Sequence, residues 1–233
     1  MELLNVFKME IFKNINDRTN LIIMGILLVL NTVGGISVRN AVMSRHGFGL
    51  GETMATVFGF SIFATVVFLF AYPYQLARMD YKNKVMSLMI ASGVSRVQYY
   101  FVKTGATLLF SLASFILLVL IPFTIVGEVN LADFHFVFND PMDIVVALSV
   151  FSSAFFILMT SVILMKGRAS TIFVFIGLNW LSSLILSPIM RTLFDVGWNS
   201  PDSAWRAMYL TNHLIIIVIF GLLGVLAIRK QDL

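Results

Sequence analysis

The chain has 233 residues, of which 59% are hydrophobic and only 12% are charged, and its formal net charge at pH 7 is +4. Soluble domains carry roughly 25% charged residues, so this composition excludes a water-soluble globular protein and indicates one that lies mostly in lipid. There is no cysteine, which excludes disulfides, thiol catalysis and cysteine-based metal sites. The basic balance is typical of positive loops on one side of a membrane, and we expect no nucleic-acid partner.

Residues 1–19 are predicted to form an amphipathic helix in the plane of the membrane interface. Its apolar side holds Leu3, Leu4, Phe7, Ile11 and Ile15. Its polar side holds Asn5, Glu10, Lys13, Asn16 and Asp17. The alternative is a frayed polar terminus. Because charges interrupt this segment before any apolar run, we do not expect a cleavable signal peptide.

Six uncharged stretches follow, and each approaches the roughly 20 apolar residues that cross a bilayer. They are Asn20–Val38, Thr53–Ala77, Thr104–Gly127, Ile144–Met165, Ala169–Met190 and Tyr209–Ile228. No linker, internal repeat or low-complexity tract separates them. We therefore predict one all-α integral membrane domain with six transmembrane helices over residues 1–233.

The basic residues predict the orientation of these helices. With both termini in the cytoplasm, the inner segments hold 12 of the 16 basic residues. The outer segments hold Arg39, Arg45, Arg191 and Arg206. Cytoplasmic loops carry an excess of Lys and Arg, so we expect both termini inside. The segment 187–208 then lies outside, and it mixes prolines and acids with large apolar residues. We predict two re-entrant half-helices there, with a simple outer loop as the alternative.

The spans contain almost no ionisable groups, and His213 is the only exception. Proton-coupled carriers keep charged residues inside the membrane, so this pattern disfavours a transporter that supplies its own energy. The chain also lacks the phosphate-binding loop of ATPases and the motifs of zinc proteases and serine hydrolases. Weak enzymatic alternatives are a metal held by Asp133 and His135, and an intramembrane protease that uses Ser182 or Ser183 with His213.

The loop 78–103, between the second and third spans, carries five basic residues and one acid. Val85, Leu88 and Met89 are spaced as one face of a short amphipathic helix, and Gly93 is placed to end it. Ser95 and Gln98 fit a capping box that starts a second helix running into the third span. The loop is then a rigid lever. The alternative is a helix resting on lipid headgroups, anchored by Lys82 and Lys84.

These features resemble the permease subunits of ABC-2 type transporters over nearly the whole chain. The resemblance rests on the six-span layout, the N-terminal helix, Ser95-Arg96, Lys103 and the closing basic residues. The family commonly has Gly-Thr where this chain has Lys84-Val85, and Ser-Pro near Gly93. The resemblance is one of class rather than of substrate.

The resemblance implies that residues 82–96 form a cytoplasmic coupling helix, which docks on a separate ATP-binding cassette subunit. The contacting residues would be Tyr81, Lys82, Lys84, Val85, Leu88, Met89, Ser95 and Arg96. The working unit would hold two ATPase subunits and a second permease, identical or different. ATP and Mg²⁺ would bind the partner, so no cofactor is expected in this chain. The location would be the bacterial plasma membrane.

The chain is rich in Phe, with 22 residues, and in Met, with 13, and Met-rich faces adapt their packing. We therefore expect amphipathic or hydrophobic cargo, in peptide or toxin export or in self-immunity. Multidrug efflux is the alternative within this class. A membrane scaffold or sensor that binds anionic lipid is the alternative without transport.

Overall fold

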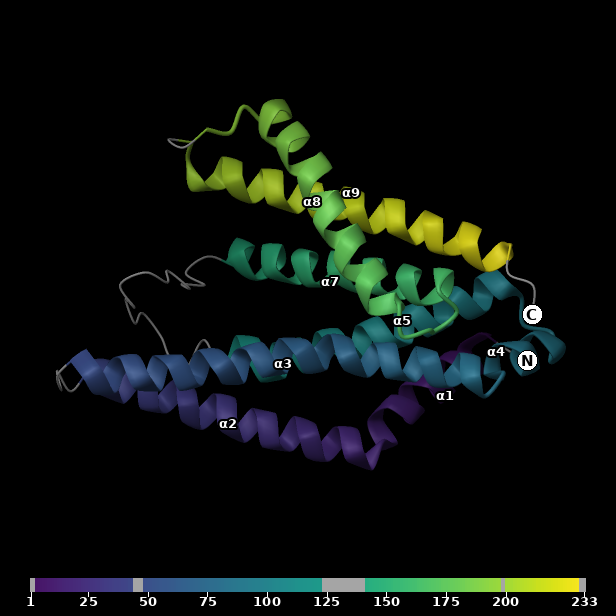
Figure 1. Ribbon diagram of the computed structural model, residues 1–233, viewed down its shortest axis with the longest axis horizontal. Coiled ribbons are helices and arrows are strands. Elements are labelled where there is room, and N and C mark those ends of the chain that lie inside the picture. The colour runs from purple at the N-terminus through teal and green to yellow at the C-terminus, as the bar shows by residue number, and fades with distance from the viewer. Residues whose placement is uncertain (1–2, 44–47, 123–140, 198–199, 231–233) are drawn as a thin grey trace. The chain divides into compact units, whose positions relative to one another are not determined.

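The computed structural model describes residues 3–43, 48–122, 141–197 and 200–230, and within these ranges it contains helices and no strand (Figure 1). The helices are α1 (Leu3–Asn16), α2 (Arg18–Met43), α3 (Phe48–Lys82), α4 (Val85–Ala91), α5 (Arg96–Phe115), the π-helix η1 (Ile116–Leu120), α7 (Pro141–Leu164), α8 (Thr171–Leu193) and α9 (Asp202–Arg229).

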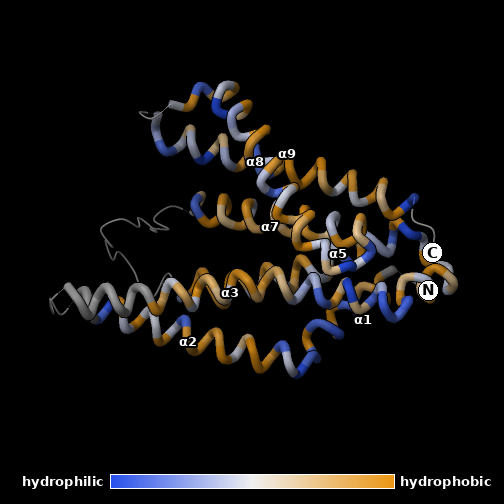
Figure 2. Tube along the Cα trace, viewed as in Figure 1, coloured by the Kyte–Doolittle hydropathy of each residue, from blue (hydrophilic) through white to orange (hydrophobic). Residues whose placement is uncertain are grey.

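Six of these helices are long and apolar enough to span a membrane, so the chain is a multi-pass membrane protein. The spanning segments are Arg18–Asn40, Val57–Lys82, Arg96–Leu120, Met142–Leu164, Thr171–Leu193 and Asp202–Arg229. Figure 2 shows apolar residues along the middle of these helices and hydrophilic residues towards their ends. The prediction of six spans is confirmed, although the third begins eight residues earlier than predicted, at Arg96.

The segment 187–208 corrects a prediction. Residues up to Leu193 continue α8, and residues from Asp202 already belong to α9. Between them, the backbone turns at Asp195, which has a φ of 49°, and buries Val196. The two predicted half-helices are therefore the ends of two long helices, because Pro188 does not end α8.

The contacts divide the chain into two compact units. Unit 1 comprises Met1–Ile11, Pro73–Leu108 and Asp140–Leu233, and unit 2 comprises Phe12–Tyr72 and Leu109–Asn139. In unit 2, the fully buried Asn31 of α2 donates its amide to Thr65 Oγ1 of α3, at 2.8 Å, and to the Leu118 carbonyl of η1, at 2.7 Å. One neutral side chain thus ties three helices together.

Unit 1 is built around α7 and α9, which lie side by side (Figure 1). Every fourth residue of α9 is buried along one row: Met208, Asn212, Ile216, Phe220, Gly224 and Ile228. The two helices run in the same direction, because Asp143 pairs with Arg206 near their starts and Ile163 shares a cluster with Ile228 near their ends. α8 packs on this pair through Phe175, Leu178 and Leu186.

Candidate coupling site

Local signals in the sequence delimit α4 and the helix that follows it. The Gly93 N–H donates to the Ile90 carbonyl at 3.0 Å, and the Val94 N–H donates to the Met89 carbonyl at 3.2 Å. With Gly93 at a φ of 95°, this is a Schellman motif, and it closes α4. The Gln98 N–H then donates to Ser95 Oγ at 3.2 Å, and the Ser95 N–H donates to Gln98 Oε1 at 3.0 Å. The predicted glycine joint and capping box are both confirmed.

The buried face of α4 differs from the predicted one. Met86 and Met89 are buried, and Val85 and Ile90 pack against the same cluster. Leu88, which we expected on that face, is instead 67% exposed, whereas Met89 is 8% exposed. Val85 and Met89 share a helix face with Leu88 on one side and with Met86 on the other. The spacing of the apolar residues therefore could not show which of these two side chains would be buried. α4 therefore presents a large apolar side chain to the outside of unit 1.

α4 packs on a cluster of buried side chains from four other helices, at one end of unit 1 that we call the α4 end. The cluster contains Val6 of α1, Val102 and the two tyrosines Tyr99 and Tyr100 of α5, Ile163 of α7 and Ile228 of α9, all buried. The start of α1 and the end of α9 lie at this end with α4 (Figure 1). A displacement of α4 would be transmitted to all of these helices, because close-packed interiors transmit strain.

A buried charged cluster lies in the same end of unit 1. Lys103 Nζ of α5 lies 2.7 Å from Glu10 Oε2 of α1 and 2.5 Å from Asp80 Oδ2 of α3. The exposed fractions of these side chains are only 5%, 2% and 3%. Tyr99 donates its hydroxyl to Asp80 Oδ2 at 3.2 Å. One ammonium thus joins two carboxylates from different helices.

This cluster corrects two predictions. Glu10 was placed on the water-facing side of α1, but the structure buries it in line with Val6 and Asn14 and leaves Leu4 and Phe12 exposed. The helices of the second and third spans also extend beyond the predicted Ala77 and Thr104, so that α3 includes Asp80 and α5 includes Lys103. The signal that was missed is the separation of four between Val6, Glu10 and Asn14, which places them on one helix face.

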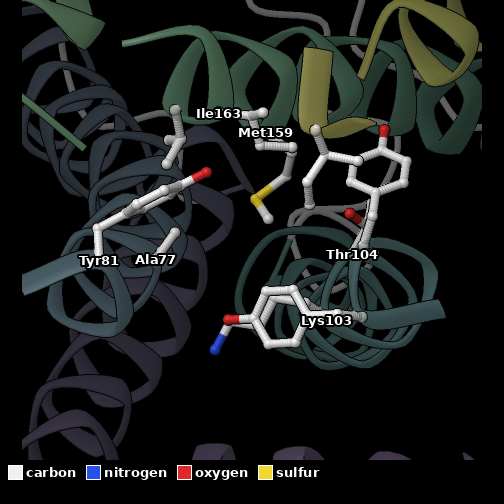
Figure 3. Close-up of a pocket in the computed structure, with 10 residues that line it drawn as sticks. Ala77, Tyr81, Lys103, Thr104, Met159 and Ile163 are labelled. Atoms are coloured by element: carbon white, nitrogen blue, oxygen red, sulfur yellow. The ribbon is translucent and has the colours of Figure 1, made fainter. Parts of the chain in front are cut away.

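A small cavity of about 20 Å³ adjoins the cluster. Figure 3 shows Ala77 and Tyr81, Met159 and Ile163, and Lys103 and Thr104 arranged around it. This volume suits a single water molecule. It is far below the 300–1,000 Å³, roughly, that a drug-sized ligand needs. The cavity is therefore not a cargo site.

The residues predicted to contact an ATPase do not all lie on one surface. Lys82, Lys84, Leu88 and Ser95 are exposed. Tyr81 and Val85 are half-buried against the cluster below α4, and Met89 is buried in it. Arg96 donates from Nη1 to the Arg229 carbonyl at 3.2 Å, which joins the start of α5 to the end of α9. Exposed contact residues are thus separated from buried ones that hold α4 in place.

His213 meets a serine other than the predicted ones. Its Nδ1 lies 2.8 Å from Ser153 Oγ of α7, whereas Ser182 Oγ donates to the Asn179 carbonyl at 2.8 Å. Ser153 Oγ also lies 2.8 Å from the Val150 carbonyl oxygen. A carbonyl oxygen only accepts hydrogen bonds, so the serine hydroxyl is the donor in that contact. When this hydroxyl proton goes to the Val150 carbonyl, His213 Nδ1–H is the donor to Ser153, and the contact is a hydrogen bond between α7 and α9.

The predicted Asp133–His135 pair lies outside the described residues. Within the described ranges, no three His, Asp or Glu side chains gather closely enough to hold a metal ion. Comparisons with protein-family models, with curated proteins and with solved structures found no match for this chain.

Proposed function

We propose that this chain is the membrane-spanning permease subunit of an ATP-driven exporter of the ABC-2 type. A separate ATP-binding cassette subunit, in two copies, supplies the energy, and a second permease completes the assembly. ATP and Mg²⁺ bind the partner, and this chain holds no catalytic residue. The location is the bacterial plasma membrane, with both termini cytoplasmic. The cargo is amphipathic or hydrophobic, in peptide or toxin export or in self-immunity.

The single observation that carries this proposal is the exposure of Leu88 on a short helix that is otherwise anchored. α4 has seven residues, which is too short for a stable isolated helix. It owes its order to the Schellman motif at its C-terminal end and to the burial of Met86 and Met89. A leucine held outward on such a support suits insertion into an apolar groove on a partner protein.

The buried cluster on which α4 packs supports the proposal that α4 transmits force to the spanning helices. Closure of the ATPase dimer would press on Leu88, and Met86 and Met89 would pass the force to Tyr99 and Tyr100 of α5. Lys103 lies one turn further along α5 and is held by Glu10 and Asp80. α1, α3 and α5 would therefore move together at this end rather than independently.

The test replaces Leu88 by Asp in the full chain, co-expressed with a candidate ATPase: a Walker-motif protein sought among the products of the neighbouring genes. Burying a leucine is worth about 1.5–3 kcal/mol, so we expect ATPase co-purification to fall at least tenfold and cargo-stimulated ATP hydrolysis to be lost. Leu88→Met should retain both activities because it keeps an apolar side chain of similar volume. Met79→Asp is the matched control, since Met79 is also an exposed apolar residue, 57% exposed, but lies on α3.

Unchanged coupling in Leu88→Asp would reject α4 as the docking element. Wild-type protein that binds no ATPase but binds vesicles of anionic lipid would favour the scaffold or sensor alternative.

Cargo class is tested separately, by the stimulation of ATP hydrolysis in the assembled complex. Stimulation by amphipathic peptides supports peptide export, whereas stimulation by small hydrophobic cations alone would favour multidrug efflux.

A further inference from the structure

The third span departs from regular α-helical geometry at η1. The Ile121 N–H there donates to the Ile116 carbonyl, five residues back instead of four. Pro122 follows in the sequence, and a proline has no N–H to donate to the carbonyl four residues before it, which is that of Leu118. The proline ring also crowds that carbonyl. We attribute the wider turn of η1 to this crowding.

The Leu118 carbonyl receives a hydrogen bond from another helix. Asn31 of α2 donates to it at 2.7 Å, and the same amide donates to Thr65 Oγ1 of α3 at 2.8 Å. The Thr65 hydroxyl donates in turn to the Ser61 carbonyl, at 2.8 Å. Asn31 and Thr65 are both fully buried. The side chain of Asn31 thus supplies the donor that position 122 lacks.

α2 and α3 form a close-packed support for this hydrogen bond. Gly34 lies three residues after Asn31, on the same side of α2. A Cβ at Gly34 would come within 3.1 Å of the Phe58 ring of α3. α2 and α3 therefore approach closely there, in addition to the bond from Asn31 to Thr65. The bond to Leu118 joins η1 to this pair of helices, and all of these residues belong to unit 2.

The carboxamide of Asn31 is used only as a donor. Its Oδ1 atom is buried and has no hydrogen-bond partner among the described residues. A buried acceptor without a partner costs free energy, and a leucine of similar size would avoid that cost. Native structures keep such costs mostly where the arrangement serves a function. We conclude that the two N–H donors of Asn31 have a role that an apolar side chain cannot fill.

We propose that η1 is a hinge in the third span and that Asn31 is the positioning residue that holds it. While Asn31 donates to the Leu118 carbonyl, η1 stays fixed to α2 and α3. When this bond breaks, position 122 offers no N–H in its place, so η1 bends away instead of closing into a regular α-helix. Prolines and π-turns are the usual sites of helix bending, and both occur here.

The test uses the absence of cysteine in the chain, because an introduced pair of cysteines is then the only one. Spin labels are attached at Ile22 of α2 and either at Ile121, which borders η1, or at Leu109, which precedes η1 on α5. All three side chains are exposed and belong to unit 2. Electron paramagnetic resonance measures the distribution of distances between the two labels in reconstituted membranes.

Asn31→Leu should broaden the distance distribution of the Ile121 pair and leave that of the Leu109 pair unchanged, because it releases η1 alone. The fraction of molecules with η1 away from α2 should rise roughly three- to twentyfold, the effect of one hydrogen bond between membrane helices. Pro122→Ala in the same background should reverse the broadening, because alanine restores an N–H that can donate to the Leu118 carbonyl.

Thr65→Val is the matched control, because it removes one acceptor of Asn31 but leaves the bond to Leu118. Both distributions should stay unchanged in this variant. Equal broadening in Thr65→Val, no broadening in Asn31→Leu, or no reversal by Pro122→Ala would each overturn the proposal. If Asn31→Leu fails to insert, Pro122→Ala in the native background decides. Its added donor should narrow the Ile121 distribution, and an unchanged or broader distribution would overturn the hinge.

The hinge goes beyond the proposed function, because the distance measurements need neither nucleotide nor an ATPase. Its use in transport rests on the proposed function: α5 begins beside α4 and continues to Phe115, directly before η1. In the assembled complex, Pro122→Ala should lower the ATP hydrolysis stimulated by an amphipathic peptide and leave ATPase co-purification unchanged. Native stimulation would refute this use. A wild-type chain that binds no ATPase would refute the proposed function and leave the hinge intact.

Discussion

Unit 1 has an ion pair or cluster towards each end of the α7–α9 pair, and the two differ in burial. At the α4 end, Lys103 joins Glu10 and Asp80, with side chains no more than 5% exposed. Towards the starts of α7 and α9, Arg206 Nε lies 2.7 Å from Asp143 Oδ1, and the side chains are 28% and 24% exposed. The chemistry is similar, but only one of the two sites is shielded from solvent.

The difference shows where the chain depends on charge. Exposed pairs contribute little, because solvent screens them and two side chains must be ordered. Buried charges depend strongly on their partners, because a charge left alone cannot recover its hydration. We infer that the α4 end is the site at which the arrangement of helices is specified by charge, and that the Asp143–Arg206 pair only fastens two helices that already pack together.

The largest effect is expected for Lys103→Met, which removes the ammonium and leaves Glu10 and Asp80 buried without it. Breaking a buried pair costs about 3–5 kcal/mol. We expect a decrease of that size in the free energy of unfolding, measured by denaturant titration of the purified protein in mixed micelles. The triple variant Glu10→Gln, Asp80→Asn, Lys103→Met should recover much of the loss because no unpaired charge remains. A loss below 1 kcal/mol in Lys103→Met would mean that solvent reaches the cluster.

The next effect tests packing at the α4 end without changing charge. A Cβ at Gly224 of α9 would come within 2.4 Å of the Tyr100 hydroxyl oxygen. Tyr100 is fully buried, so moving its ring aside would disturb the residues packed around it, and Gly224→Ala should cost about 1–3 kcal/mol. Gly221→Ala is the matched control one turn earlier, because its Cβ would meet nothing closer than Phe156, at 3.7 Å. Equal stability of the two variants would show that Tyr100 has room to move.

Local patterns in the sequence predicted much of this fold. Hydropathy located six spans, since a length of about 20 apolar residues is set by the bilayer itself. The C-terminal end of α4 and the start of α5 were predicted because Gly93, Ser95 and Gln98 act through hydrogen bonds to residues only a few positions away. Such signals require no knowledge of the tertiary fold.

The buried cluster could not be predicted in the same way. Glu10 and Lys103 are 93 residues apart in the sequence, and their meeting depends on how α1 and α5 pack. A glutamate on an amphipathic helix normally faces water, so burial of Glu10 runs against the usual preference. The same limit applies to His213, whose partner, Ser153, lies 60 residues away. On α4, Met86 is buried in place of Leu88 because of how the neighbouring helices pack, which the local sequence does not show.

A smaller effect is expected for Ser153→Ala, which removes the contact with His213 in the middle of the α7–α9 pair. A neutral hydrogen bond contributes about 1 kcal/mol, and Ile157, Ile216 and Phe220 continue to pack nearby. We expect a decrease of that size in the free energy of unfolding and no loss of cargo-stimulated ATP hydrolysis. His213→Ala should behave in the same way. Complete loss of activity in both variants at unchanged stability would instead indicate a catalytic or proton-carrying role for the pair.

The smallest effect is expected for Arg206→Gln, at the half-exposed pair. An exposed ion pair contributes about 0–1 kcal/mol, and Trp205 and Met208 keep the first turns of α9 packed on the end of α8. The decrease in stability should also shrink as salt is raised from 0.01 to 0.5 M or so, because screening acts on pairs that solvent reaches. Glu10→Gln should show no such salt dependence. If Arg206→Gln costs as much as Lys103→Met, burial does not distinguish the two sites, and the contrast between the ends of unit 1 fails.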